Sequence, residues 1–178
     1  MSLDMLELYS RASEWANQKV AGAVTDLDVP TPCDAWDVRT FLDHMLETQR
    51  HFLRTARGED ASLPAPMPPP GLSDDPVDDF NRSRTDMLAA FGESGVIEKT
   101  GPSLGIAFSD QLLHGWDLAK ATGQDPAMPS GLAAAAFETI HGRFTGEQRK
   151  GVFKPTIAVA DDASPQERLL AYTGRQPG

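Results

Sequence analysis

The side chains best suited to chemistry in this sequence are histidines and an aspartate. Asp110 and His114 stand four residues apart, and His44 and His51 stand seven apart far upstream. On a helix, residues at i and i+4 share one face about 5–6 Å apart, close enough to bind one ion together. A third ligand from a neighbouring helix would leave one coordination position open, as catalytic zinc requires. The pattern indicates a divalent-metal site.

A structural interpretation of the same residues stays open. On a helical wheel Asp110, His114 and Asp117 lie opposite the large apolar residues of their helix, so they could form a solvated face. His44 lies on the flank of an apolar stripe, where one hydrogen bond would satisfy it. Spacing alone does not decide, because Asp-x-x-x-His is a weak motif without a partner from elsewhere in the fold.

Other candidate residues have a structural interpretation that we favour. Cys33 precedes a predicted helix, which would lower its pKa, but a role in the Pro-Cys-Asp turn fits better because no histidine is near it in sequence. His51 and His141 are expected at the surface or on a helix flank. Trp116 is expected to pack in the core rather than line a pocket. Asp117 is expected to form a structural hydrogen bond or face solvent, rather than orient His114.

Helical periodicity predicts four long helices that would position these side chains. The first covers residues 5–23, and the second is capped by Asp34 and ends before Gly58. The third runs from Asp75-Pro76 to Phe91, and the fourth covers 104–122. The fourth is apolar on more than one side, which is typical of a central helix. The segment 63–70 is rich in proline and cannot be helical.

Shorter elements follow the fourth helix. A helix is predicted from Leu132 to about Arg143, and a capping box with proline at its first position opens a last one at Ser164 that ends at Gly174. Between them, 156–160 is β-prone and is expected to be an extended arm. The sequence therefore predicts an all-α bundle of four helices with short additional C-terminal helices and an extended C-terminal arm, in one domain over 1–178.

Composition narrows the classes of partner. The net charge is −10, from 26 acidic and 16 basic residues. Such a chain repels phosphate backbones and anionic lipid, so neither nucleic acid nor membrane is an expected partner. One cysteine, an acidic amino terminus and no apolar run near the ~20 residues of a membrane span favour a cytoplasmic protein. A homodimer is left open.

Three blocks resemble one known family. They are TPCDAWDVR with LDHML (31–39 and 42–46), DQLLHGWDLA with ATGQ (110–119 and 121–124), and ASPQERLLAYTGR (163–175). Together they resemble the DinB/YfiT-like metal-binding family of actinobacteria, which includes the N-terminal domain of mycothiol-dependent maleylpyruvate isomerase. The resemblance implies a DinB-like four-helix bundle with His44, Asp110 and His114 as metal ligands. Relatives often carry Glu or His where this chain has the shorter Asp110.

Two functions follow from the resemblance. In the first, a divalent metal, zinc or else nickel, activates mycothiol or water for attack on a small electrophile, as a transferase or isomerase. The isomerase has a second, carboxy-terminal domain that this chain is too short to contain, which argues against that particular activity. In the second, the chain is a non-catalytic metal-binding or stress-related ligand-binding module. The expected partners are a small-molecule thiol and an electrophilic substrate.

Overall fold

The computed structural model describes residues 4–33 and 35–178 and divides into two compact units, Met1–Ala127 and Met128–Gly178. Within those described ranges every regular element is a helix and none is a strand. The all-α prediction is confirmed. The expectation of one domain over the whole chain stays a prediction.

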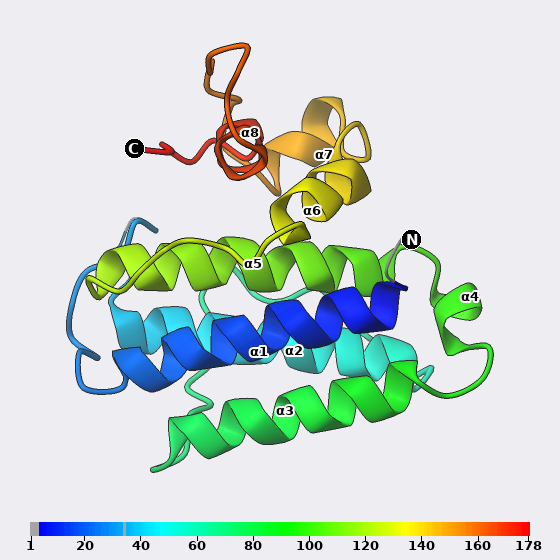
Figure 1. Cartoon of the computed structure of the whole chain (residues 1–178). Coiled ribbons are helices and arrows are strands. Elements are labelled where there is room, and N and C mark those ends of the chain that lie inside the picture. Colours follow the sequence, from blue (N-terminus) through cyan, green and yellow to red (C-terminus); the bar gives the residue numbers. More distant parts are fainter. Residues whose placement is uncertain (1–3, 34) are drawn as a thin grey trace. The chain divides into compact units, whose positions relative to one another are not determined.

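The first unit is a four-helix bundle (Figure 1). Its long helices are α1 (Met5–Ala23), α2 (Val38–Ala56), α3 (Pro76–Phe91) and α5 (Ser103–Ala121). Helices α1 and α2 each pack against both α3 and α5, so α2 and α5 are neighbours, as a site shared by His44 and His114 requires. The colours of Figure 1 show that α1 and α5 run in one direction while α2 runs in the opposite one.

Helix ends are set by short polar side chains. Asp37 caps α2 by accepting a hydrogen bond from the Thr40 backbone N–H at 2.9 Å. The predicted cap, Asp34, lies outside the described residues. Asp75 caps α3 with Pro76 at the first helical position, as predicted. An N-cap oxygen satisfies one of the backbone donors that the first helical turn leaves without a partner.

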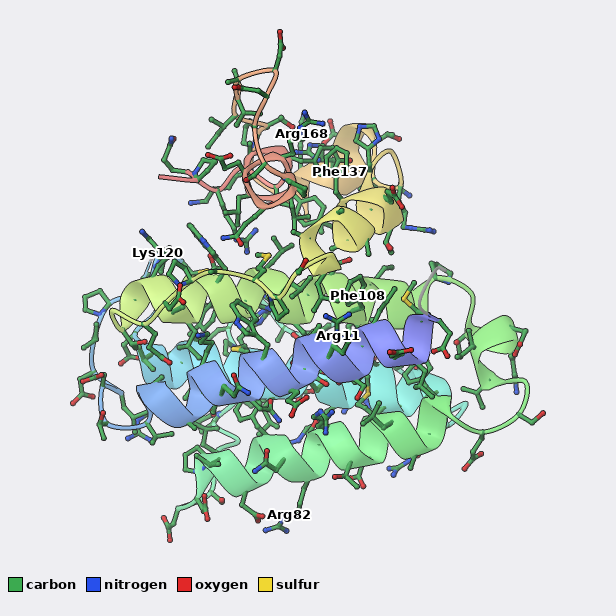
Figure 2. All side chains as sticks on the ribbon, viewed as in Figure 1. Arg11, Arg82, Phe108, Lys120, Phe137 and Arg168 are labelled. Atoms are coloured by element: carbon green, nitrogen blue, oxygen red, sulfur yellow. The ribbon has the colours of Figure 1, made fainter. Side chains whose placement is uncertain are left out.

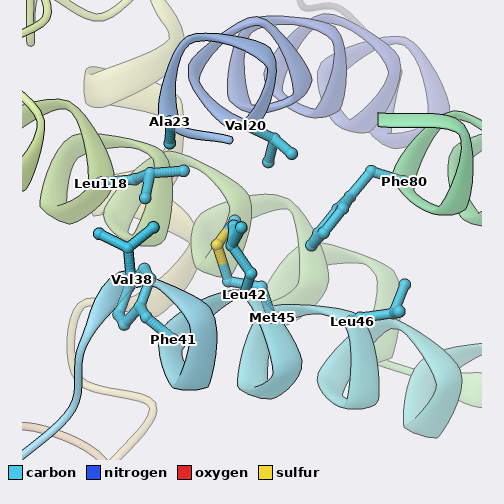
Figure 3. Packing of buried hydrophobic residues seen from close by; sticks show 9 residues of the cluster. All are labelled: Val20, Ala23, Val38, Phe41, Leu42, Met45, Leu46, Phe80 and Leu118. Carbon is cyan, nitrogen blue, oxygen red and sulfur yellow. The ribbon is translucent and has the colours of Figure 1, made fainter. Parts of the chain in front are cut away.

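An apolar cluster fills one part of the bundle (Figure 3). Phe80 reaches from α3 toward Met45 and Leu46 of α2, and Leu118 joins from α5. Charged side chains such as Arg82 of α3 point away from the bundle (Figure 2). Helix α5 is buried on several sides because it packs against both α1 and α2, which confirms the prediction that it is central. The apolar cluster consists of Val20, Ala23, Val38, Phe41, Leu42, Met45, Leu46, Phe80 and Leu118.

The proline-rich connection 63–70 is extended, as predicted, and exposes Leu63 and Met67. Its far end is fixed to α2. The buried carboxylate of Asp43 accepts hydrogen bonds from the backbone N–H groups of Gly71 (2.8 Å) and Leu72 (3.1 Å). The connection therefore returns to α2 one residue before His44.

The second unit contains α6 (Leu132–Ile140), α7 (Gly146–Lys150) and α8 (Pro165–Tyr172). Helix α6 packs against α8. The predicted capping box is present at Ser164, and the predicted arm is extended, with the Ile157 N–H bonded to the Ala171 carbonyl at 2.9 Å. With 51 residues and only short helices, this unit has little core of its own.

Two short helices were not predicted from sequence, α4 (Val96–Thr100) and α7. Each has five residues, no buried residue and no side-chain cap. A helix this short offers neither an apolar repeat nor a capping residue by which the sequence could indicate it. Among the helices of the described chain, none combines the length and apolar character that crossing a membrane requires.

Candidate metal centre

A tight turn before α2 places an aromatic ring over His44. Ala35 adopts a left-handed conformation with φ of 68°, which is uncommon for a residue with a side chain. The turn closes with a hydrogen bond from the Thr31 N–H to the Trp36 carbonyl at 3.1 Å. The ring of Trp36 then lies 4.8 Å from that of His44, measured between centroids. The block that resembles the family at 31–46 therefore builds one wall around His44.

The structure brings His44 and His114 together from two adjacent helices. Their ring centroids are 5.0 Å apart and the rings are perpendicular. Phe41, one turn before His44, packs edge-on against His114 at 5.3 Å. On α5, Asp110 Oδ2 lies 3.0 Å from His114 Nδ1. The i and i+4 spacing thus has the geometry expected from the sequence.

The solvated-face interpretation does not describe these residues. The side chains of His114 and Asp110 are 12% and 19% exposed, so they lie at the edge of the interior. Asp117 is 1% exposed, which excludes the solvent-facing position considered for it. Trp116 is buried at 5%, as expected for core packing. Helix α5 is too enclosed to offer a polar face to solvent.

Burial keeps His44 uncharged at neutral pH. The pKa of His44 is lowered to about 4. Loss of hydration is the largest cause, the nearby His114 also lowers it, and the negative charge of Asp110 opposes the shift. Its buried Nδ1 makes no hydrogen bond with any described residue. A neutral imidazole with an available lone pair is the form that ligates metals.

The residues have the donor types of a divalent-metal site, two imidazoles and one carboxylate. As the side chains stand, no three His, Cys, Asp or Glu groups within 4–33 and 35–178 surround one point at ligand distances. Two imidazoles on one tetrahedral zinc, with Zn–N near 2.0–2.1 Å, would have ring centres about 5 Å apart. The observed 5.0 Å agrees with that value, and Asp110 supplies the carboxylate. The three-ligand site remains a prediction.

A polar interior beside these residues was not found from the sequence. The Tyr9 hydroxyl donates to Gln49 Oε1 at 2.5 Å, joining α1 to α2 across the bundle. Loss of hydration raises the pKa of Tyr9, and the negative charge of Asp110 raises it further. Thr48 and Gln49 are 7% and 3% exposed. No sequence motif links residues 40 positions apart. The sequence could have indicated this polar interior only through the polar residues on helices that pack into the bundle.

The remaining candidates take structural positions. Cys33 belongs to the turn before α2, where its carbonyl accepts from the Thr31 hydroxyl at 3.1 Å and from the Trp36 N–H at 3.2 Å. His51 Nδ1 contacts the Ser62 carbonyl at 2.9 Å, at the start of the proline-rich connection. His141 lies in the second unit, is exposed, and stacks with Phe137. The ring of His51 packs edge-on against that of Phe52, with the centroids 5.2 Å apart.

Comparison with known proteins identifies the class of this bundle. The family model described as the mycothiol maleylpyruvate isomerase N-terminal domain matches residues 11–119, so the chain belongs to that family. The matched span contains His44, Asp110 and His114. The chain is also similar to uncharacterized proteins from two strains of Mycobacterium tuberculosis, H37Rv and CDC 1551, each 26% identical over 188 residues, covering 97% of this chain and 98% of the relative. No solved structure matches the chain significantly.

Proposed function

We propose that the bundle binds one divalent metal ion, zinc or else nickel, through His44, Asp110 and His114. The observation that carries the proposal is the perpendicular pair of imidazoles, 5.0 Å apart on two adjacent helices, with Asp110 3.0 Å from His114. Two neutral imidazoles and one carboxylate are ordinary ligands of zinc at a catalytic site. Membership of a mycothiol-related family supports the same site.

The protein residues would hold the ion and leave room for a small molecule. A bound divalent ion would lower the pKa of a coordinated thiol or water and supply a nucleophile near neutral pH. Two neutral ligands and one carboxylate would leave one net positive charge, which favours an anionic thiolate. The low pKa of His44, about 4, keeps protons from competing for its nitrogen at neutral pH. Partial exposure of Asp110 and His114 leaves the site reachable from solvent.

The thiol we propose is mycothiol, and the reaction is its transfer to a small electrophile or a thiol-assisted isomerisation. The name of the matched family is the support for this thiol. The ring of Trp36, which packs on His44 at 4.8 Å, would shield one side of the site from water.

Metal titration of paired variants tests the proposal. Calorimetry should show one zinc ion per wild-type chain. His114→Ala should lose at least about a hundredfold in zinc affinity, because one of three protein ligands is removed. Cys33→Ser is the matched control, and it should keep both zinc content and any thiol-transfer activity with mycothiol and a panel of electrophiles that includes maleylpyruvate.

Each alternative has its own outcome. Zinc binding without thiol binding or transfer would favour the non-catalytic module. Full activity in metal-free protein that disappears only in Cys33→Ser would replace the metal mechanism with a cysteine one. Equal zinc affinity in wild type and His114→Ala would remove the site itself.

A further inference from the structure

Two buried side chains of α2 have hydrogen-bonding groups with no partner in the part of the chain that the structure describes. Thr48 Oγ1 and Gln49 Nε2 make no hydrogen bond with any described residue, although Thr48 is 7% and Gln49 3% exposed. Most buried polar side chains in folded proteins have a partner. A buried donor without a partner lowers the stability of the fold. Adjacent unmatched donors on one helix therefore point to a ligand that supplies the acceptor.

The position of these donors is fixed relative to the candidate metal centre. Thr48 is one turn after His44, so the two share a face of α2. Because α2 and α5 run in opposite directions, one turn from His44 to Thr48 matches the turn from His114 back to Asp110 (Figure 1). Thr48 therefore lies level with Asp110. Gln49 is the next residue along α2, so it lies close to the same level of the bundle.

Tyr9 orients the amide of Gln49. Its hydroxyl donates to Gln49 Oε1 at 2.5 Å, which commits the oxygen and turns the Nε2 amide donor away from Tyr9. Tyr9 is itself 1% exposed and held inside the bundle. The tyrosine is a positioning residue, and the groups left to meet a ligand are the Gln49 N–H and the Thr48 hydroxyl.

We propose that Thr48 and Gln49 form a subsite that binds a neutral carbonyl oxygen of the substrate beside the metal centre. This inference deepens the proposed function and rests on it for the role of the bound molecule. Both groups donate hydrogen bonds, and a carbonyl oxygen with two lone pairs accepts both. The ligand group is uncharged because the carboxylate of Asp110 lies level with the subsite and would repel a second carboxylate in this buried setting.

Acetone and acetate form a matched pair of probes, since they have similar shape and differ in charge. In nitrogen-15 NMR spectra of the full chain, acetone should shift the Gln49 side-chain amide signal, identified by its disappearance in Gln49→Glu. Metal-free protein should bind acetate more weakly than acetone. Thr48→Val and Gln49→Glu should each weaken acetone binding about fivefold to tenfold, the effect of losing one hydrogen bond.

Substitutions of side chains that already have hydrogen-bond partners serve as controls, because they separate loss of acetone binding from loss of folding. Thr55→Val removes a hydroxyl from the same helix that bonds the His51 carbonyl at 3.1 Å, and Gln124→Glu removes an amide that already bonds the Lys19 carbonyl at 2.9 Å. Both should bind acetone as the wild type does. Tyr9→Phe should weaken acetone binding about threefold and move the Gln49 amide signal even without acetone, because one hydrogen bond to that amide is lost.

The titrations with and without zinc separate this inference from the proposed function. Acetone binding that depends on Thr48 and Gln49 in a protein that binds no zinc would keep the subsite and remove the metal centre. Zinc binding with acetone affinity unchanged in both variants would keep the metal centre and overturn the subsite. Absence of any acetone effect on the Gln49 signal, or metal-free acetate binding as tight as acetone, would also overturn it.

Discussion

Helix α2 contributes side chains to two regions of the bundle, and the regions differ in whether their buried polar groups have hydrogen-bond partners. The apolar cluster takes Leu42, Met45 and Leu46 from it, all at most 2% exposed. The polar interior takes Thr48 and Gln49, which are similarly enclosed but have donors unmatched within residues 4–33 and 35–178. Apolar groups need only close packing, whereas buried donors need acceptors.

The difference assigns separate roles to the two regions. Removing apolar surface from water stabilises the fold by roughly 25 cal/mol per Å². Unmatched buried donors lower the free energy of unfolding. Proteins usually keep such donors at sites where a ligand supplies the missing acceptor. We therefore expect substitutions in the apolar cluster to lower stability, and substitutions among Thr48, Gln49 and the candidate ligands to change binding with smaller effects on stability.

The largest effect on stability should come from Leu42→Ala. Leu42 has no exposed surface, so truncation leaves a cavity and should lower the free energy of unfolding by about 2–5 kcal/mol. Urea denaturation at pH 7 measures it. A loss below about 1 kcal/mol would mean that this part of the bundle is loosely packed, and the contrast between the two regions would weaken.

An intermediate effect is expected from the pH dependence of His44 in metal-free protein. Folding lowers the pKa of His44 from 6.5 to about 4, so between those values the unfolded chain holds a proton that the folded chain lacks. The contribution is fully present above pH 6.5 and is lost as pH falls toward 4. From pH 7 to pH 4.5 it amounts to roughly 2–3 kcal/mol.

Urea denaturation of the wild type and His44→Gln, both with a chelator, isolates this contribution. Between pH 7 and pH 4.5, the free energy of unfolding should fall by roughly 2–3 kcal/mol less in the variant than in the wild type, because glutamine does not titrate. Parallel pH profiles for the two proteins would show that His44 is well hydrated, contrary to its enclosed position.

The smallest effect on stability is expected from Thr48→Val. Valine has nearly the shape of threonine and removes a buried hydroxyl that has no partner among the described residues, so the free energy of unfolding should change by less than about 0.5 kcal/mol or rise slightly. Thermal unfolding followed by circular dichroism is sufficient. A loss above about 1.5 kcal/mol would show that the hydroxyl has a structural partner and would erase the difference between the two regions.

Much of the fold followed from periodicity because the long helices are amphipathic and end at recognisable residues. Asp75-Pro76 opened α3 and the Ser164 capping box opened α8, as the sequence indicated. The start of α2 did not follow, because local rules allow either Asp34 or Asp37 as the cap, and Asp37 is the one that caps the helix. One-turn helices such as α4 have no apolar stripe and left no signal.

The candidate site was predictable in part. The i and i+4 relation of Asp110 and His114 is local, so spacing was enough to expect their contact. The approach of His44 depends on which helices are neighbours, and a family resemblance supplied that. The hydrogen bond from Tyr9 to Gln49 joins opposite helices of the bundle, and no local pattern contains that information.

X-ray absorption at the zinc edge tests the central claim most directly. Protein loaded with one equivalent of zinc should show nitrogen and oxygen ligands at about 2.0–2.2 Å, with the outer scattering of two imidazoles and no sulfur. His44→Ala and His114→Ala should each lose one imidazole or fail to hold the ion. A sulfur ligand near 2.3 Å, which only Cys33 or a methionine could provide, or an imidazole count unchanged in both variants, would contradict a centre built from His44, Asp110 and His114.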